Sequence, residues 1–104
     1  MAIRVYTTPS VPLKISGRLI ADSDIYVTFT HRNGTMNFKT PDITVTESGT
    51  DTLITVPFTQ EQTAIFTVGE VISIEVNWMK NGNREATDIA YIKVTDNLLK
   101  EILS

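Results

Sequence analysis

The segment from Val71 to Leu103 places the tightest constraint on what this chain can fold into. It reads VISIEVNWMK, then NGNRE, then ATDIAYIKVTD, and it ends in NLLKEIL. Apolar and polar residues alternate along the first run, which is the period of a β-strand with one buried face. We therefore expect two strands joined by a polar Asn-Gly turn, followed by a short apolar terminal segment.

The alternation also predicts which side chains reach the core. On the first of these strands four apolar side chains share one face: Ile72, Ile74, Val76 and Trp78. We expect the side chains between them to face solvent, and Trp78 to be a core residue rather than part of a site. The returning strand, from about Thr87 to Thr95, offers four residues to the core: Ile89, Tyr91, Ile92 and Val94.

Similar alternation recurs along the whole chain. About seven or eight short strands at spacings of roughly 8–12 residues, with turn residues between them, predict an all-β fold, a β-sandwich that forms one domain over residues 1–104. The Asn33-Gly34 pair predicts a hairpin, since the type I′ turn needs a positive φ at both central residues. Pro9 and Pro12 cannot donate a hydrogen bond, so their region is expected at an edge or kink of a sheet.

Two helical segments are expected. Thr59 and Gln62 match a capping box, which predicts a short helix that ends by Gly69 and connects two sheets. Asp96 is a suitable N-cap for a C-terminal helical turn that carries four apolar residues: Leu98, Leu99, Ile102 and Leu103.

Composition argues against several classes of protein. The chain has no cysteine, which rules out disulfides, thiolate metal sites and cysteine nucleophiles. Its net charge is −3, and its 9 basic residues are scattered, so we expect no nucleic-acid partner. No apolar run is long enough for a signal peptide or a membrane span. We expect no membrane partner, and a protein that stays in a cytoplasm or leaves it by lysis.

The polar residues form no recognisable catalytic or metal-binding pattern. His31 is the single histidine, and its place before a turn predicts a surface position. Asp22 and Asp24 lie in one turn, but a calcium site needs six to eight oxygen ligands, and a strand follows directly. No serine lies in a G-x-S-x-G motif, and the 5 glycines form no phosphate-binding loop. We therefore expect a protein that is not an enzyme and that uses no metal or cofactor.

The apolar terminal cluster of Leu98, Leu99, Ile102 and Leu103 is the candidate interface. A helical turn this short is marginal alone, so it must pack on something. It can fold back and cover an open end of the sandwich, or it can dock on a neighbouring subunit. The residues do not decide between these alternatives.

The chain also resembles a known class of proteins. The runs TQEQTAIFTVGEVISIEVNWM, NGNRE and ATDIAYIKVTDNLLKEIL, together with IYVTFTHRNG earlier on, are similar to small all-β proteins in structural modules of tailed phages and prophages of Gram-positive gut bacteria. This resemblance implies an immunoglobulin-like fold and a virion-associated accessory protein of the tail or baseplate. It implies assembly or attachment as the role, in the virion or host cytoplasm, as a homo-oligomer or with other phage structural proteins. It supplies no catalytic residue.

Two other functions remain open. A β-sandwich that binds carbohydrate or a host surface needs exposed aromatic residues, for which Tyr6, Tyr26 and Tyr91 are candidates. The alternation does not show whether these three side chains share a surface. A small inhibitor or regulator acting through its surface is the other alternative.

Overall fold

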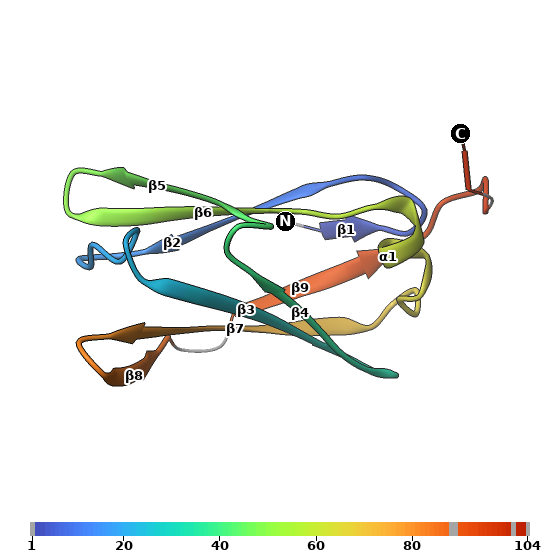
Figure 1. The fold of residues 1–104 in the computed structure, drawn as a ribbon. Helices are drawn as coiled ribbons and strands as arrows, with labels where there is room; N and C mark the ends of the chain where they lie inside the picture. The colour runs from blue at the N-terminus through green and yellow to red at the C-terminus, as the bar shows by residue number, and fades with distance from the viewer. Residues whose placement is uncertain (1, 88–89, 101, 104) are drawn as a thin grey trace.

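The computed structural model describes residues 2–87, 90–100 and 102–103, in which two β-sheets lie one above the other (Figure 1). The larger sheet has the order β1-β9-β7-β3-β4, with β8 also paired to β7. Its strands are β1 (Ala2–Arg4), β3 (Asp24–His31), β4 (Gly34–Lys39), β7 (Val71–Lys80), β8 (Asn83–Ala86) and β9 (Ala90–Thr95). The smaller sheet has the order β2-β6-β5, formed by β2 (Ser10–Ile15), β5 (Thr44–Ser48) and β6 (Asp51–Pro57). The all-β sandwich predicted from the sequence is confirmed at this level.

The returning strand after β7 is present but divided in two. β8 pairs with the end of β7, where Lys80 lies opposite Asn83, and β9 pairs with its beginning, where Ile72 lies opposite Ile92. Both lie on the side of β7 away from β3. This division gives the described residues nine strands, more than the seven or eight expected.

The predicted inward face of β7 is confirmed, because all four of its apolar residues are buried, Trp78 included. On β9, Ile92 and Val94 are buried as expected. The prediction for Tyr91 is wrong: it is exposed, since it lies opposite Ser73 on the outward face of the sheet. Ile89 lies outside the described residues.

The two Asn-Gly turns differ. Asn81 and Gly82 both have positive φ, of 52° and 78°, as a type I′ turn requires. In the hairpin between β3 and β4 the two loop residues are instead Arg32 and Asn33, because His31 lies opposite Gly34. Positive φ occurs there only at Gly34, so the hairpin is confirmed but its predicted turn type is wrong.

The predicted capping box begins the single helix of the described residues, α1 (Gln60–Ala64), which leads from the smaller sheet to the larger one. Thr59 Oγ1 accepts from the N–H of Gln62, and Gln62 Oε1 accepts from the N–H of Thr59. β2, which contains Pro12, is an edge strand as predicted.

The C-terminal helical turn is wrong for residues 96–100 and 102–103, which form no helix. The N–H of Leu103, which a helix would direct to the carbonyl oxygen of Leu99, is bound by Gln60 Oε1 instead. Asp96 Oδ1 accepts from the N–H of Asn97, and Asn97 Oδ1 accepts from that of Leu99. A helix this short has little stability of its own, so the contact with Gln60 can replace it.

An aromatic cluster joins the two layers. Phe58 follows β6, and its ring centroid lies 5.0 Å from those of Phe29 on β3 and Phe38 on β4. On its other side it lies 6.0 Å from Phe66, which follows α1. All of these pairs meet edge to face, the arrangement that aromatic quadrupoles favour. Phe58 therefore contacts both the larger sheet and the segment after the helix.

Replacing Phe58 by alanine is expected to lower the free energy of unfolding by about 3–5 kcal/mol. The substitution removes a buried ring and leaves a cavity at the contact between the two sheets. Urea denaturation followed by Trp78 fluorescence measures this change. Ile65→Ala is the control: Ile65 is 50% exposed, so its loss should cost about 1 kcal/mol at most. Equal losses in the two variants would show that Phe58 has no special role.

Candidate functional site

The terminal segment, residues 96–100 with 102–103, extends from the end of the sandwich where α1 lies (Figure 1). Its four apolar side chains are at most partly covered. Leu98 is fully exposed, and Leu99, Ile102 and Leu103 are 47%, 45% and 57% exposed. The segment therefore does not bury the predicted cluster within its own chain.

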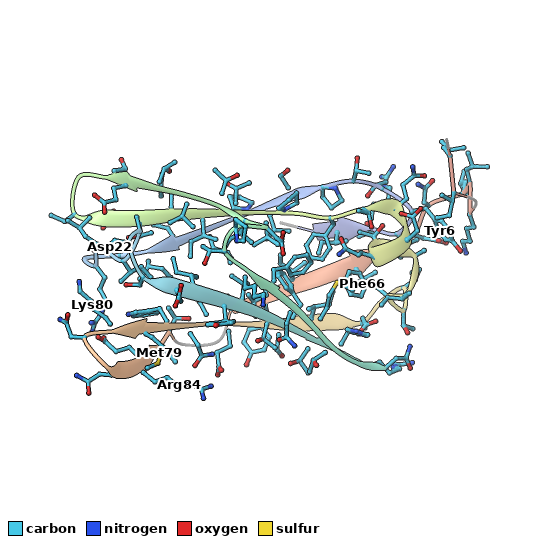
Figure 2. All side chains as sticks on the ribbon, in the orientation of Figure 1. Tyr6, Asp22, Phe66, Met79, Lys80 and Arg84 are labelled. Atoms are coloured by element: carbon cyan, nitrogen blue, oxygen red, sulfur yellow. The ribbon has the colours of Figure 1, made fainter. Side chains whose placement is uncertain are left out.

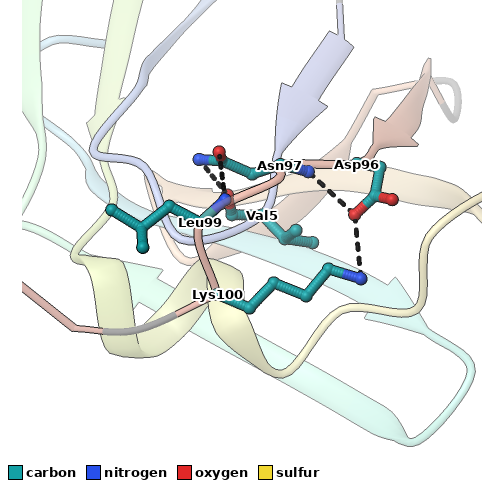
Figure 3. A network of polar contacts seen from close by, with 5 residues as sticks. All are labelled: Val5, Asp96, Asn97, Leu99 and Lys100. Carbon is teal, nitrogen blue, oxygen red and sulfur yellow. Dashed lines mark hydrogen bonds and ion pairs between the residues drawn. The ribbon is translucent and has the colours of Figure 1, made fainter.

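Polar contacts hold the start of this segment (Figure 3). The side chain of Asn97 donates from Nδ2 to the carbonyl oxygen of Val5, at 3.3 Å. The same side chain accepts from the N–H of Leu99, also at 3.3 Å. Asn97 therefore connects the end of β9 to the residues after β1.

A second polar contact holds the far end. Gln60, the first residue of α1, donates from Nε2 to the carbonyl oxygen of Leu103 at 2.8 Å. Its Oε1 accepts from the N–H of Leu103 at 2.7 Å. One amide side chain thus satisfies both backbone groups of Leu103, as a neighbouring strand would. The backbone is fixed while the apolar side chains stay available.

One ion pair lies inside the segment. Lys100 Nζ is 3.2 Å from Asp96 Oδ1, and both side chains are exposed. The hydrogen bond from Lys100, and then that from the N–H of Asn97, lower the pKa of Asp96 below its ordinary value of 3.8. A lowered pKa in the folded chain means that these contacts favour the ordered segment above pH 3.8. They are lost as the pH falls through the lowered pKa.

Replacing Lys100 by methionine should raise the pKa of Asp96 toward its ordinary value, because the largest cause of the shift is removed. The pKa is measured by an NMR titration of the side-chain carboxyl carbon. Lys39→Met, on β4, removes the same charge elsewhere and should leave the pKa unchanged. An Asp96 pKa that Lys100→Met does not alter would contradict the observed pairing.

The predicted surface position of His31 is wrong, because its side chain is buried. The inward-facing residues of β3 are Ile25, Val27 and Phe29, and His31 continues this row to the end of the strand. Its ring meets that of Phe66 edge to face at 5.3 Å. The single histidine is therefore part of the packed interior.

Glu70, directly before β7, is a buried carboxylate that the sequence did not single out. Its Oε1 accepts from the N–H of Arg32 at 2.7 Å, and its Oε2 accepts from the N–H of Thr67. The side chain therefore joins the β3–β4 turn to the loop after α1. Since both oxygens accept backbone N–H groups, the carboxylate has a structural role.

Glu70→Gln is expected to lower the free energy of unfolding by about 1–3 kcal/mol, because an amide has one acceptor oxygen and leaves one N–H unpaired. The control is Glu47→Gln on β5, where the side chain is exposed and the same change should cost less than about 0.5 kcal/mol. Chemical denaturation measures both. Equal stability of the two variants would contradict the assigned role.

The remaining acidic and aromatic candidates are dispersed. Asp22, Asp24 and Lys80 line one shallow hollow, and Lys80 Nζ donates to the carbonyl oxygen of Leu19 at 3.1 Å (Figure 2). Within the described ranges, no group of three or more histidine, cysteine or acidic residues is placed to hold a metal ion. Tyr6 packs partly against the core, whereas Tyr26 is exposed on the outward face of β3. The described residues include no helix of the length and apolarity that crossing a membrane requires.

Sequence reasoning identified the apolar residues of the segment but missed the polar residues that position it. Gln60 was part of the predicted helix, and its partner lies 43 residues further along the chain. Asn97 contacts Val5 across 92 residues, and Glu70 contacts Arg32 across 38. Their local sequence carries no signal for these contacts, because each partner is brought close only by the folded sandwich.

The segment presents apolar side chains on a backbone that Gln60 and Asn97 anchor. In comparisons with known proteins, the chain matches no family model and no curated protein sequence.

Proposed function

We propose that this chain is a non-enzymatic structural or assembly protein of a tailed phage or prophage, associated with the tail or baseplate. It acts through contacts with other protein chains, in the virion or in the host cytoplasm. The observation that carries the proposal is the terminal segment, whose four apolar side chains are 45–101% exposed while its backbone is anchored. The resemblance to small phage structural proteins supplies the biological setting.

The energetic argument rests on the cost of leaving these side chains in water. Burying one leucine or isoleucine fully is worth about 1.5–3 kcal/mol. A partner that covers Leu98 and the exposed parts of Leu99, Ile102 and Leu103 would gain several such increments. Because Gln60 and Asn97 already hold the backbone, less conformational entropy is lost on binding than for a disordered tail.

We further propose that the sandwich is immunoglobulin-like. The order β9-β7-β3 in one sheet and β2-β6-β5 in the other corresponds to the strand orders G-F-C and B-E-D of that fold. β4 then takes the place of strand C′. The chain departs from antibody domains in lacking cysteines and in carrying its tryptophan, Trp78, on the strand equivalent to F rather than to C.

A structural role is also supported by what the buried polar groups do. The Glu70 carboxylate accepts two backbone N–H groups, and His31 packs against Phe66. Thr63 Oγ1 accepts from the N–H of Thr7 and donates to its carbonyl oxygen. Each of these groups connects one segment of the fold to another.

The proposal predicts self-association through the terminal segment. Light scattering on the purified chain should give a molar mass above that of one chain, and deletion of residues 97–104 should reduce it to the monomer. The double variant Leu98→Ser, Leu103→Ser should also shift the mass toward the monomer, because it removes two exposed apolar contacts. Leu53→Ser is the matched control: it changes an exposed leucine on β6 and should leave the mass unaltered.

A monomer both before and after deletion would contradict self-association. The proposal would then require association with other phage proteins. This is tested by affinity purification of the tagged chain from cells that carry the whole phage module. Tail proteins should accompany the original chain but not the double variant. Their absence from both samples would reject the proposed function.

A further inference from the structure

A hollow lies on the outer face of the larger sheet, away from the smaller sheet and from the terminal segment. It has a volume of about 340 Å³, near the lower end of the range for ligand pockets. The residues that line it come from four strands and include Tyr26, Thr28, Asn37, Asn77, Met79 and Arg84. Figure 2 shows Met79 and Arg84 on this side of the sheet, near the β7–β8 turn.

Strand register explains why these side chains meet. Tyr26 on β3 lies opposite Asn77 on β7, and Thr28 lies opposite Asn37 on β4. Met79 lies opposite Arg84 on β8. Residues that are two apart on a strand share a face, so all six project outward together.

Hydrogen bonds fix the orientation of the polar groups. Thr28 Oγ1 donates to Asn37 Oδ1 at 2.7 Å, which directs the amide nitrogen of Asn37 away from that bond. Arg84 Nε donates to Asn77 Oδ1 at 3.2 Å, and Asn77 Nδ2 donates to Glu75 Oε1 at 2.8 Å. A guanidinium has five N–H donors, and one of Arg84's is used here among the described residues. The amides and the guanidinium are therefore held in place beside an exposed tyrosine ring.

We propose that this hollow, centred on Tyr26, is a binding site for a neutral carbohydrate chain. The face of a pyranose ring carries C–H groups that pack on an aromatic ring, and Tyr26 is 43% exposed. Sugar hydroxyls both donate and accept hydrogen bonds, which matches the Asn37 and Asn77 amides, the Arg84 guanidinium and the Glu75 carboxylate. This site goes beyond the proposed structural role and does not depend on it.

An extended ligand fits the shape of this face better than a single sugar. A second hollow of about 100 Å³ adjoins the first, since Thr28 lines both. It continues between β3 and β7 past Thr30, Ser73 and Glu75. The two hollows thus form a track along the strands.

The charges around the hollow favour a neutral ligand. On the strands that line it, Lys39 and Arg84 are matched by Asp24 and Glu75, all on outward-facing positions. A phosphate or carboxylate ligand would need an excess of cations. A protein partner would need a larger apolar centre, whereas the hollow's exposed apolar residues are Tyr26 and Met79.

The test is an NMR titration of the isotope-labelled full chain with cellohexaose, maltohexaose, xylohexaose, mannohexaose and N-acetylchitohexaose, each up to about 10 mM, since millimolar binding is expected for such a shallow site. At least one should shift the amides of Tyr26, Asn37, Asn77 and Arg84. Tyr26→Ala and Asn37→Ala should each weaken that binding, the first by about tenfold or more.

Leu53→Ala is the control. Leu53 is exposed on β6 of the smaller sheet, away from both hollows. Its loss should change the affinity by less than about twofold. Spectra of all three variants establish that each remains folded.

Three outcomes would overturn the assignment. One is that none of the five oligosaccharides shifts any of the four amides. Another is that Leu53→Ala weakens binding as much as Tyr26→Ala does. The third is that Tyr26→Ala alters the molar mass seen by light scattering, which would make this face a protein interface. The deletion of residues 97–104 has no bearing on sugar binding, so failure of either proposal is distinguishable from failure of the other.

Discussion

The packing of Phe58 between the sheets is the contact on which the rest of the structure depends. Its ring packs against Phe29 and Phe38 on the larger sheet, although Phe58 directly follows β6 of the smaller sheet. The capping box at Thr59 follows directly in the chain and begins α1 beside this contact. Gln60 at the start of α1 holds Leu103, so the terminal segment is anchored next to the same packing.

The two proposed surfaces lie toward opposite ends of the molecule. The terminal segment is beside α1, while Met79 and Arg84 are near the β7–β8 turn (Figures 1 and 2). The longest dimension of the chain is 45 Å, so a subunit bound at one end leaves the other face accessible. A protein that is fixed in an assembly at one end and binds a sugar at the other would join the two roles of assembly and attachment.

Features that depend on neighbouring residues were predictable from the sequence. The period of β7 identified its buried face, and the Thr59–Gln62 spacing identified the helix cap. Features that depend on where a strand ends, or on which of two adjacent apolar residues turns inward, were not. Tyr91 faces outward because its neighbour Ile92 takes the inward position, and His31 faces inward because β3 extends far enough to include it. The terminal turn is not a helix, because the side chain of Gln60 binds the N–H of Leu103 from a distant part of the chain, which a capping pattern does not reveal.

The division of the strand after β7 into β8 and β9 affects how readily the sheets of two copies of the chain can pair. β7 spans ten residues, and β8 and β9 together cover the side that β3 does not, so the longest strand has partners on both sides. The strands at the margins of the described sheets are β1, β2, β4, β5 and β8, which span three to six residues, and β2 contains Pro12. Short or proline-containing margins are poor templates for pairing with another chain. Copies of the chain at high concentration are therefore kept from fusing through their sheets, and side chains rather than strand edges are the groups that they present to one another.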